Sequence, residues 1–242
     1  MILAIDAGNT RIKWGLWEDR GFVAQGSVLS ARAADLADAL HRLARPRDAI
    51  GSSVAGASVT AQIERVLAPW GVAVRWIAAT ASACGVTSGY AEPAQLGADR
   101  WAALIGAHAR FAEACLVVNA GTAITIDALT ADGRFLGGLI LPGIELMASA
   151  LARGTAGLVQ RPGRFETFPT STGNAIHSGA LQAACGAIER MQRGMHAAGH
   201  EPPRVVLSGG AAHLLAPLLE HAPTLAPSLV LEGLIESARA CD

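Results

Sequence analysis

The sequence contains few cysteines and no paired cysteine motif. Its 242 residues include only four cysteines, which stand far apart at Cys84, Cys115, Cys185 and Cys241. Because no C-x-x-C pair is present, neither a zinc knuckle nor a dithiol redox motif is supported. We therefore expect buried or idle thiols in a reducing cytosol.

A strong net charge and a long apolar run are also missing. Charged residues make up 16% of the chain, and the formal net charge is −1 without any block of like charges. This composition gives no electrostatic footprint for nucleic acid, which we exclude as a main partner. The strongest apolar windows, residues 115–126 and 135–144, are shorter than the roughly 18 residues of a membrane helix. The N-terminus has no basic region typical of a secretory signal, so we expect a cytoplasmic protein without a membrane partner.

The motifs of several common enzyme classes do not occur. The seven histidines show no H-E-x-x-H or other ligand spacing, so a histidine metal site is not predicted. No G-x-S-x-G, Walker A or protein-kinase glycine loop is present. The usual hydrolase, P-loop and protein-kinase functions are thereby excluded.

The chain does contain enough apolar material, 51% of its residues, to build a substantial core. Short apolar runs separated by turn residues predict three strands at residues 2–5, 12–17 and 22–28. Helical and strand patterns alternate after them, which indicates an α/β fold.

The second half of the chain repeats the order of the first. Strands are predicted at residues 115–118, 123–129 and 134–141, and residues 117–123 (Val-Val-Asn-Ala-Gly-Thr-Ala) match residues 4–10 (Ala-Ile-Asp-Ala-Gly-Asn-Thr). A period of half the chain is too long for a solenoid. We predict two similar α/β lobes around a central cleft, an N-terminal lobe of residues 1–113 and a C-terminal lobe of residues 114–242, whose glycine turns face each other.

The first glycine turn, Asp6-Ala7-Gly8-Asn9-Thr10, has a composition suited to phosphate. Gly8 lets the backbone approach phosphates closely, Thr10 offers a hydroxyl, and Asp6 can hold Mg²⁺ or its water shell. Lys13, on the next strand, can reach the phosphates as a point charge. An ordinary hairpin turn explains this short motif better when it stands alone. The matching second turn favours a nucleotide clamp.

A second motif, Gly97-Ala98-Asp99-Arg100, precedes an apolar helical pattern. Asp99 would lie in the first helical turn, where the helix dipole keeps it ionised and able to accept a hydroxyl proton during phosphoryl transfer. Arg100 could bind an anionic substrate through two hydrogen bonds. A plain helix cap is an equally good explanation of Asp99.

Two other turns have simple structural explanations beside functional ones. Ser208-Gly209-Gly210 follows a buried strand and would let an adenine approach the backbone, but a strand-to-helix turn also needs these residues. Ser171-Thr172 precedes a helix, and an N-cap requires only a hydroxyl.

Together these residues resemble a known family, the type III pantothenate kinases. This family includes the Bvg accessory factors and has the actin-like ATPase (ribonuclease H-like) fold of the acetate and sugar kinase/Hsp70/actin superfamily. The features that carry the resemblance run over nearly the whole chain: Asp6-Ala7-Gly8-Asn9-Thr10, Tyr90 with Gly97-Ala98-Asp99-Arg100, Gly121-Thr122-Ala123 with Thr125 and Asp127, Thr172 with Ala175-Ile176, and Leu207-Ser208-Gly209-Gly210.

The resemblance implies ATP-dependent phosphorylation of pantothenate to 4′-phosphopantothenate, the first step of coenzyme A biosynthesis. The residues it assigns to ATP are Asp6, Ala7, Gly8, Asn9, Thr10, Arg11, Ile12, Lys13 and Thr122. Those it assigns to pantothenate are Tyr90, Gly97, Ala98, Asp99, Arg100 and Thr172, with Asp99 as the proton acceptor. It also implies Mg²⁺ with ATP, a monovalent cation (K⁺ or NH₄⁺), and a homodimer with substrate pockets at the subunit interface.

Two positions depart from the family pattern. Asn119 stands before the second Gly-Thr turn where the family typically has an Asp, so a monovalent cation there would meet an amide oxygen without a charge. Glu92 stands near Tyr90 where an Asn is usual. Two alternative functions remain: a kinase for another small hydroxylated acid or sugar, and a nucleotide-binding regulator without chemistry.

Overall fold

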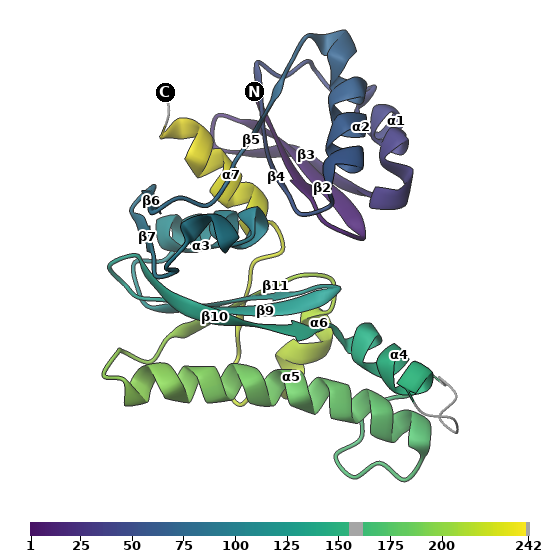
Figure 1. Cartoon of the computed structure of the whole chain (residues 1–242), viewed down its shortest axis with the longest axis vertical. Helices are drawn as coiled ribbons and strands as arrows, with labels where there is room; N and C mark the ends of the chain where they lie inside the picture. The colour runs from purple at the N-terminus through teal and green to yellow at the C-terminus, as the bar shows by residue number, and fades with distance from the viewer. Residues whose placement is uncertain (155–161, 241–242) are drawn as a thin grey trace. The chain divides into compact units, whose positions relative to one another are not determined.

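The computed structural model describes residues 1–154 and 162–240 (Figure 1). Contacts divide the chain into two compact units. Unit 1 contains Met1–Ala112, Gly133–Phe135 and the segment that begins at Ser228, and unit 2 contains Glu113–Asp132 and Leu136–Pro227. The lobes of residues 1–113 and 114–242 were predicted from the internal sequence repeat and not from contacts. Their boundary stays a prediction.

The sheet of unit 1 begins with the three strands expected at the N-terminus. Its members are β1 (Ile2–Ala7), β2 (Arg11–Glu18), β3 (Gly21–Leu29), β4 (Asp48–Ser53) and β5 (Val74–Trp76), in the order β3-β2-β1-β4-β5. Strand β1 pairs antiparallel with β2 and parallel with β4. Side chains alternate between the two faces of a strand, so Asp6 lies on the face opposite Leu3, Ile5 and Ala7.

Helices cover both faces of this sheet (Figure 1). Leu3, Ile5 and Ala7 belong to a core cluster shared with α1 (Leu36–Leu40) and α2 (Ala57–Leu67). On the other face lie α7 (Leu229–Arg239) and α3 (Ala98–Arg110). These two helices meet at glycines: a Cβ on Gly233 would stand 1.8 Å from the Ala102 carbonyl oxygen, and one on Gly106 would stand 2.5 Å from that of Leu229. The last helix therefore joins unit 1 through a contact that only glycine permits.

A small hairpin completes unit 1. Strands β6 (Ser82–Ala83) and β7 (Val86–Ser88) pair antiparallel, and β7 pairs in parallel with Arg134 and Phe135 at the start of β10 (Arg134–Pro142). Phe135 is fully buried. Because β7 and β10 are distant in sequence, their pairing brings separate segments of the chain together in this part of the unit.

Unit 2 repeats the strand order of unit 1. Strands β8 (Cys115–Ala120), β9 (Ala123–Leu129), β10, β11 (Arg204–Ser208) and β12 (Thr224–Leu225) lie in the order β10-β9-β8-β11-β12. As in unit 1, the first strand pairs antiparallel with the second and parallel with the fourth, and the fourth pairs parallel with the fifth. The prediction of a duplicated α/β fold is confirmed.

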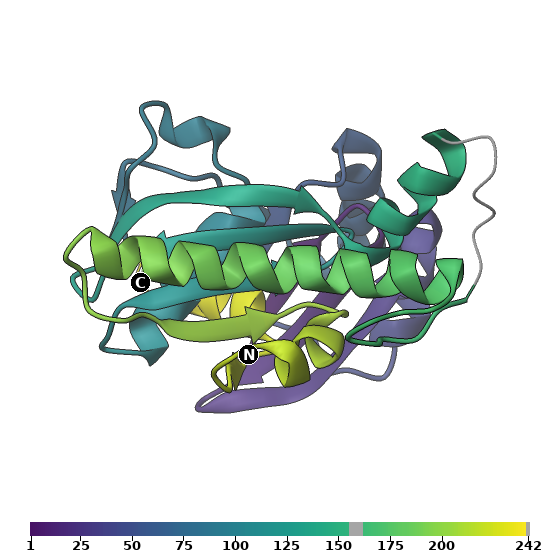
Figure 2. The same cartoon turned by 90° about the horizontal axis from the view of Figure 1, so that it is seen from below.

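A long helix covers the sheet of unit 2. Helix α5 (Thr172–Ala197) runs across it in Figure 2 and contributes Leu181, Ala184 and Ile188 to a core with β8, β9 and β11. Helix α4 (Ile144–Gly154) follows β10, and α6 (Ala212–Leu215) follows β11. Helix α6 gives way to a 3₁₀ turn (Ala216–Leu218) at Pro217, which has no N–H to donate. Within the described ranges no helix combines the length and apolarity needed to cross a membrane.

The cysteines of the described ranges, Cys84, Cys115 and Cys185, form no disulfide with one another. Cys115 and Cys185 are buried, and burial raises the pKa of Cys115 to about 12 and that of Cys185 to about 11. Both thiols therefore stay protonated near neutral pH. Cys84 is half-buried, and Cys241 lies outside the described residues.

Candidate active site

The hairpin between β1 and β2 is held in shape by its own backbone and by one serine. The N–H of Gly8 donates to the carbonyl of Arg11 at 3.1 Å, and the hydroxyl of Ser30 donates to the carbonyl of Gly8 at 2.6 Å. Asn9 and Thr10 are exposed at the tip. The turn therefore presents polar groups to solvent from a fixed backbone.

The residues of this segment differ in what they can offer a nucleotide. The side chains of Ala7 and Ile12 are fully buried in the core, so only their backbone groups are available. Arg11 is exposed, and its guanidinium donates to the Ser27 hydroxyl at 3.1 and 2.7 Å. Asn9, Thr10, Arg11 and Lys13 are the members whose side chains are accessible and polar.

Asp6 stands at the end of β1 between two side chains of neighbouring strands. Its direct strand partners are Ser52 on β4 and Lys13 on β2, and paired residues share a face of the sheet. The hydroxyl of Ser52 donates to Oδ1 of Asp6 at 3.0 Å. A carboxylate, a hydroxyl and an ammonium group thus form one row across three strands.

The environment of Asp6 favours its protonated form. Its pKa is raised to about 6, chiefly by burial and also by the nearby Asp99 carboxylate, while the Lys13 ammonium and the Ser52 hydrogen bond partly oppose the rise. Two carboxylates close enough to repel each other are a common arrangement for binding a cation or moving a proton. A bound cation would favour the ionised form of Asp6.

Asp99 lies in the first turn of α3, as the sequence predicted. Its Oδ1 accepts the N–H of Arg100 at 2.9 Å, and the side chain is half-buried. The carboxylate folds back over the residue before the helix, because a Cβ on Gly97 would stand 2.7 Å from Oδ1. Gly97 therefore leaves the space that the carboxylate occupies, and Ala98 begins the helix behind it.

Arg100 is buried among aromatic rings. It is 5% exposed, and its Nη1 donates to the hydroxyl of Tyr90 at 3.1 Å. Its guanidinium carbon lies 5.8 Å from the centre of the Tyr90 ring and 6.0 Å from that of Phe135. The two rings are 5.4 Å apart. Cation–π contacts of this kind fix the direction of a guanidinium before a ligand arrives.

Unit 2 carries a row that corresponds to the Asp6 row. Asn119 on β8 has Ser208 on β11 and Thr125 on β9 as direct strand partners. The following hairpin is closed by a hydrogen bond from the N–H of Gly121 to the carbonyl of Ala123 at 3.0 Å, and Thr122 is exposed at its tip. The row is polar but lacks a charged side chain.

Thr172 is the remaining predicted substrate residue. It begins α5 and is exposed, while Ser171 is the N-cap and accepts the N–H of Asn174 at 3.4 Å. The capping explanation thus applies to Ser171, and the hydroxyl of Thr172 stands at the surface of unit 2.

Three residues of these sites were missed from the sequence. Ser52, Phe135 and Gly143 contact predicted residues: Ser52 and Phe135 as described above, and Gly143 by donating its N–H to the carbonyl of Thr122 at 2.8 Å. A serine within a buried strand such as β4 could have indicated a polar partner nearby, because a buried hydroxyl needs a hydrogen bond. Nothing in the local pattern around Phe135 or Gly143 pointed to the motifs they contact.

The predicted cations can be tested against these donors. Mg²⁺ is commonly bound by one or two carboxylates together with substrate phosphates and water, which fits Asp6 with Asp99 nearby. The neutral oxygens of Asn119, Thr125 and Ser208 fit a monovalent cation better than a divalent one. No group of three His, Cys, Asp or Glu side chains in residues 1–154 and 162–240 could hold a metal ion alone. A divalent cation at Asp6 therefore requires further oxygens from the substrate or from water.

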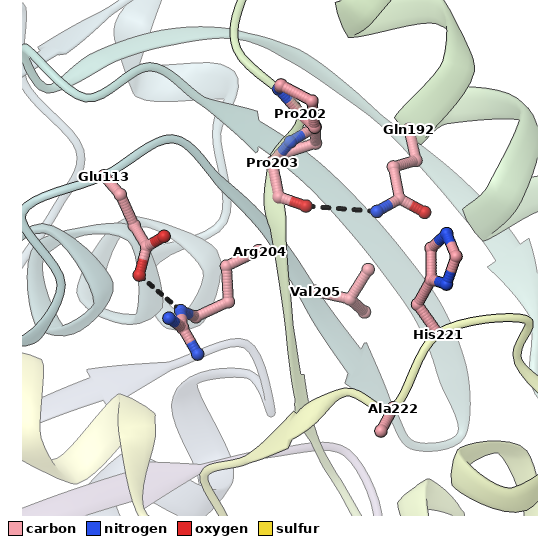
Figure 3. A pocket seen from close by; sticks show the side chains of 8 residues that line it. All are labelled: Glu113, Gln192, Pro202, Pro203, Arg204, Val205, His221 and Ala222. Carbon is pink, nitrogen blue, oxygen red and sulfur yellow. Dashed lines mark hydrogen bonds and ion pairs between the residues drawn. The ribbon is translucent and has the colours of Figure 1, made fainter.

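Unit 2 also contains a separate pocket, which Figure 3 shows. Glu113 and Arg204 form an ion pair on one side, and Gln192 donates to the carbonyl of Pro203 at 3.1 Å on the other. None of the predicted site residues lines this pocket.

Solved structures with the same fold are found at low sequence identity. A Baf family protein from Campylobacter jejuni superposes with a TM-score of 0.62 and 18% identity, covering 98% of this chain and 97% of that one. A PilM-PilN type IV pilus biogenesis complex superposes with a TM-score of 0.53 and 13% identity, covering 100% and 98%. These similarities support the actin-like ATPase fold.

Sequence comparisons are more specific. The family model of the type III pantothenate kinases matches residues 2–194. A type III pantothenate kinase of Aromatoleum aromaticum is 50% identical over 240 residues, covering 99% of this chain and 98% of the relative. One from Azoarcus sp. is 46% identical over 246 residues, covering 100% and 93%. The chain therefore belongs to the type III pantothenate kinase family.

Proposed function

We propose that this chain transfers the γ-phosphoryl group of ATP to pantothenate, giving ADP and 4′-phosphopantothenate, with Asp99 as the proton acceptor. Membership of the family supports the reaction. The observation that supports the mechanism is the carboxylate pair of unit 1, in which Asp99 stands close enough to Asp6 to raise its pKa.

Asp99 has the features of a general base for this transfer. The hydroxyl oxygen of pantothenate attacks the γ-phosphorus, the bond from this phosphorus to the β,γ-bridging oxygen breaks, and the hydroxyl proton passes to Asp99. The N–H of Arg100 fixes the direction of Oδ1, and the side chain lies in the first turn of α3.

Asp6 and Lys13 would serve the nucleotide. Asp6 would hold Mg²⁺ or its water shell, and Lys13, its direct strand partner, would contact phosphate oxygens as a point charge. Bound Mg²⁺ supplies the charge neutralisation that phosphoryl transfer needs. Gly8, Asn9 and Thr10 would contribute backbone N–H groups and a hydroxyl from the fixed turn, as would Thr122 from the second hairpin.

Arg100 would recognise the carboxylate of pantothenate. Its guanidinium is already directed by Tyr90 and Phe135, so little side-chain entropy is lost when an anion binds. Gly97, Ala98 and Thr172 would complete the acceptor site, as the family resemblance implies.

The proposal extends to the setting in which the enzyme works. It includes a homodimer, a monovalent cation (K⁺ or NH₄⁺) at Asn119, and a cytoplasmic location without nucleic-acid or membrane partners. The neutral oxygen row at Asn119 supports the cation, and the net charge of −1 supports the absence of a nucleic-acid partner. Exposed apolar side chains such as Ile140 and Phe168, 66% and 88% exposed, offer surface for a second subunit.

An Asp99→Asn variant tests the mechanism. We expect turnover to fall on the order of 10³-fold, within the range of losses seen when one catalytic group is removed. ATP binding should change little, because the amide oxygen can still accept the Arg100 N–H. The measurement is pantothenate-dependent ADP release in a coupled assay with Mg²⁺ and K⁺.

A matched control is Glu145→Gln, which removes another first-turn carboxylate, at the exposed start of α4. This variant should keep wild-type activity. Full activity of Asp99→Asn would remove Asp99 from the mechanism. ADP release by the wild type that requires a sugar or another short acid, or that needs no acceptor, would contradict the choice of pantothenate.

A further inference from the structure

The side chain beside Asp6 on β4 is unusual for its position. Ser52 lies near the end of a buried strand and is itself fully buried. Small polar residues pack poorly in such strands, and a buried hydroxyl destabilises a protein unless it finds a hydrogen-bond partner. The partner of Ser52 is Oδ1 of Asp6, at 3.0 Å. The hydroxyl of Ser52 therefore contacts a residue of the candidate active site and not a group of the apolar core.

The hydrogen bond restricts the carboxyl group of Asp6. With Oδ1 held by Ser52, rotation about the bond that carries the carboxyl is limited and Oδ2 has a defined direction. Hydrogen bonds between a neutral donor and an ion are stronger than neutral ones, so the restriction is greatest when Asp6 is ionised. Lys13 flanks Asp6 from the opposite strand and restricts it by charge alone.

The repeat in unit 2 provides an internal comparison. Ser208 occupies the corresponding place on β11 beside Asn119, and it is also buried. Ser208 belongs to the proposed cation row, so it cannot serve as a neutral control. Ser237→Ala is the control for the purely structural effect of losing a buried serine, because Ser237 is buried on α7 and its hydroxyl donates to the carbonyl of Gly233 at 2.8 Å.

We propose that Ser52 is a positioning residue for the transfer, whose hydroxyl holds the Asp6 carboxylate in the orientation that receives magnesium-bound ATP. This assignment rests on the proposed function, because it assumes that Asp6 serves the nucleotide. It predicts that Ser52 matters for ATP that carries Mg²⁺ and much less for free ATP or for pantothenate.

Calorimetric titration of ATP, with and without Mg²⁺, tests the assignment directly. We expect Ser52→Ala to weaken magnesium-bound ATP about tenfold and free ATP less than twofold, since one hydrogen bond to a charged group is lost. Ser52→Thr keeps the hydroxyl and should restore binding to within about threefold. Ser237→Ala should leave the Mg²⁺-dependent gain in affinity unchanged. Thermal unfolding of each variant identifies any loss caused by misfolding.

Kinetics separate this proposal from the proposed function. In the coupled assay Ser52→Ala should raise the KM for magnesium-bound ATP about tenfold, with the KM for pantothenate unchanged. Equal losses of magnesium-bound and free ATP, or equal effects of Ser52→Ala and Ser237→Ala, would overturn the role of Ser52. A wild type that binds magnesium-bound ATP but never phosphorylates pantothenate would overturn the proposed function and leave the binding result for Ser52 valid.

Discussion

The first strands of the two sheets end in rows that share a position and differ in charge. In unit 1 the row is Asp6, Ser52 and Lys13, and in unit 2 it is Asn119, Ser208 and Thr125. The strand order and the pairing directions around both rows are the same. The fold therefore does not require charges there, because the neutral row supports an equivalent sheet. The charges of Asp6 and Lys13 are therefore explained by function, and the proposed binding of magnesium-bound ATP is such a function.

The hairpins that follow the two rows differ as well. Ala7 pairs with Ile12 and encloses four residues, whereas Ala120 pairs with Ile124 and encloses three. The longer turn is tied to Ser30, and the shorter one to Gly143. Similar strands thus carry turns of different shape, each supported by a residue from elsewhere in its own unit.

Converting the charged row into a copy of the neutral one should have the largest effect. An Asp6→Asn variant keeps the size of the side chain and an acceptor for the Ser52 hydroxyl but removes the charge. We expect kcat/KM for magnesium-bound ATP to fall on the order of 10³-fold, because the electrostatic contribution to phosphoryl transfer is lost. The coupled ADP assay measures this. If the variant kept more than a tenth of wild-type activity, the difference between the rows would not be catalytic.

The same variant should be more stable than the wild type in the absence of ligands. The pKa of Asp6 rises from 3.8 in the unfolded chain to about 6 in the folded one, chiefly because the group is buried. Between these pH values the folded protein holds more protons than the unfolded chain, so the free energy of unfolding falls as the pH rises. This contribution is fully present below about pH 4 and is lost above about pH 6.

Asparagine does not ionise, so Asp6→Asn should avoid that loss. At pH 7 to 8 we expect it to exceed the wild type in free energy of unfolding by up to about 3 kcal/mol, at 1.36 kcal/mol for each pKa unit. The advantage should shrink as the pH falls toward 4. Denaturant titrations at several pH values, without ATP or Mg²⁺, provide the measurement. A variant less stable than the wild type at pH 8 would show that the charge of Asp6 is well accommodated in the folded state.

The sequence predicted those parts of the site that depend on residues close together in the chain. The turn at Gly8 and the helix that begins near Asp99 depend on local composition, and both were placed correctly. Ser52 could not be assigned a partner, since the register of β1 with β4 joins residues 46 positions apart. Phe135 reaches Tyr90 and Arg100 because β10 pairs with β7. That pairing also joins residues distant in sequence, so local patterns could not predict it.

Local patterns also failed where tertiary contacts override helix propensity. Leu36, Leu40 and Leu43 stand at helical spacing in the alanine-rich stretch 31–43, and this pattern by itself predicts one helix there. The structure has a 3₁₀ segment, Ser30–Asp35, that bends at Arg32 before the short α1. Ser30 is bound to the first hairpin through its N–H and its hydroxyl, at Thr10 and Gly8 respectively. These contacts fix the start of the segment, and the periodicity of later residues does not reveal them.

The reciprocal change, Asn119→Asp, should have the smallest effect and tests the neutral row. A carboxylate at this position would face Thr125 and Ser208 instead of an ammonium group, so it should not create a second nucleotide site. It should strengthen binding of a monovalent cation by adding a charge to a set of neutral oxygens. We expect the K⁺ concentration for half-maximal activity to fall about threefold, with kcat within about twofold of the wild type. Activity measured against KCl, with choline chloride keeping the ionic strength constant, gives the comparison. An unchanged K⁺ dependence would mean that the cation binds elsewhere and that the second row serves the fold alone.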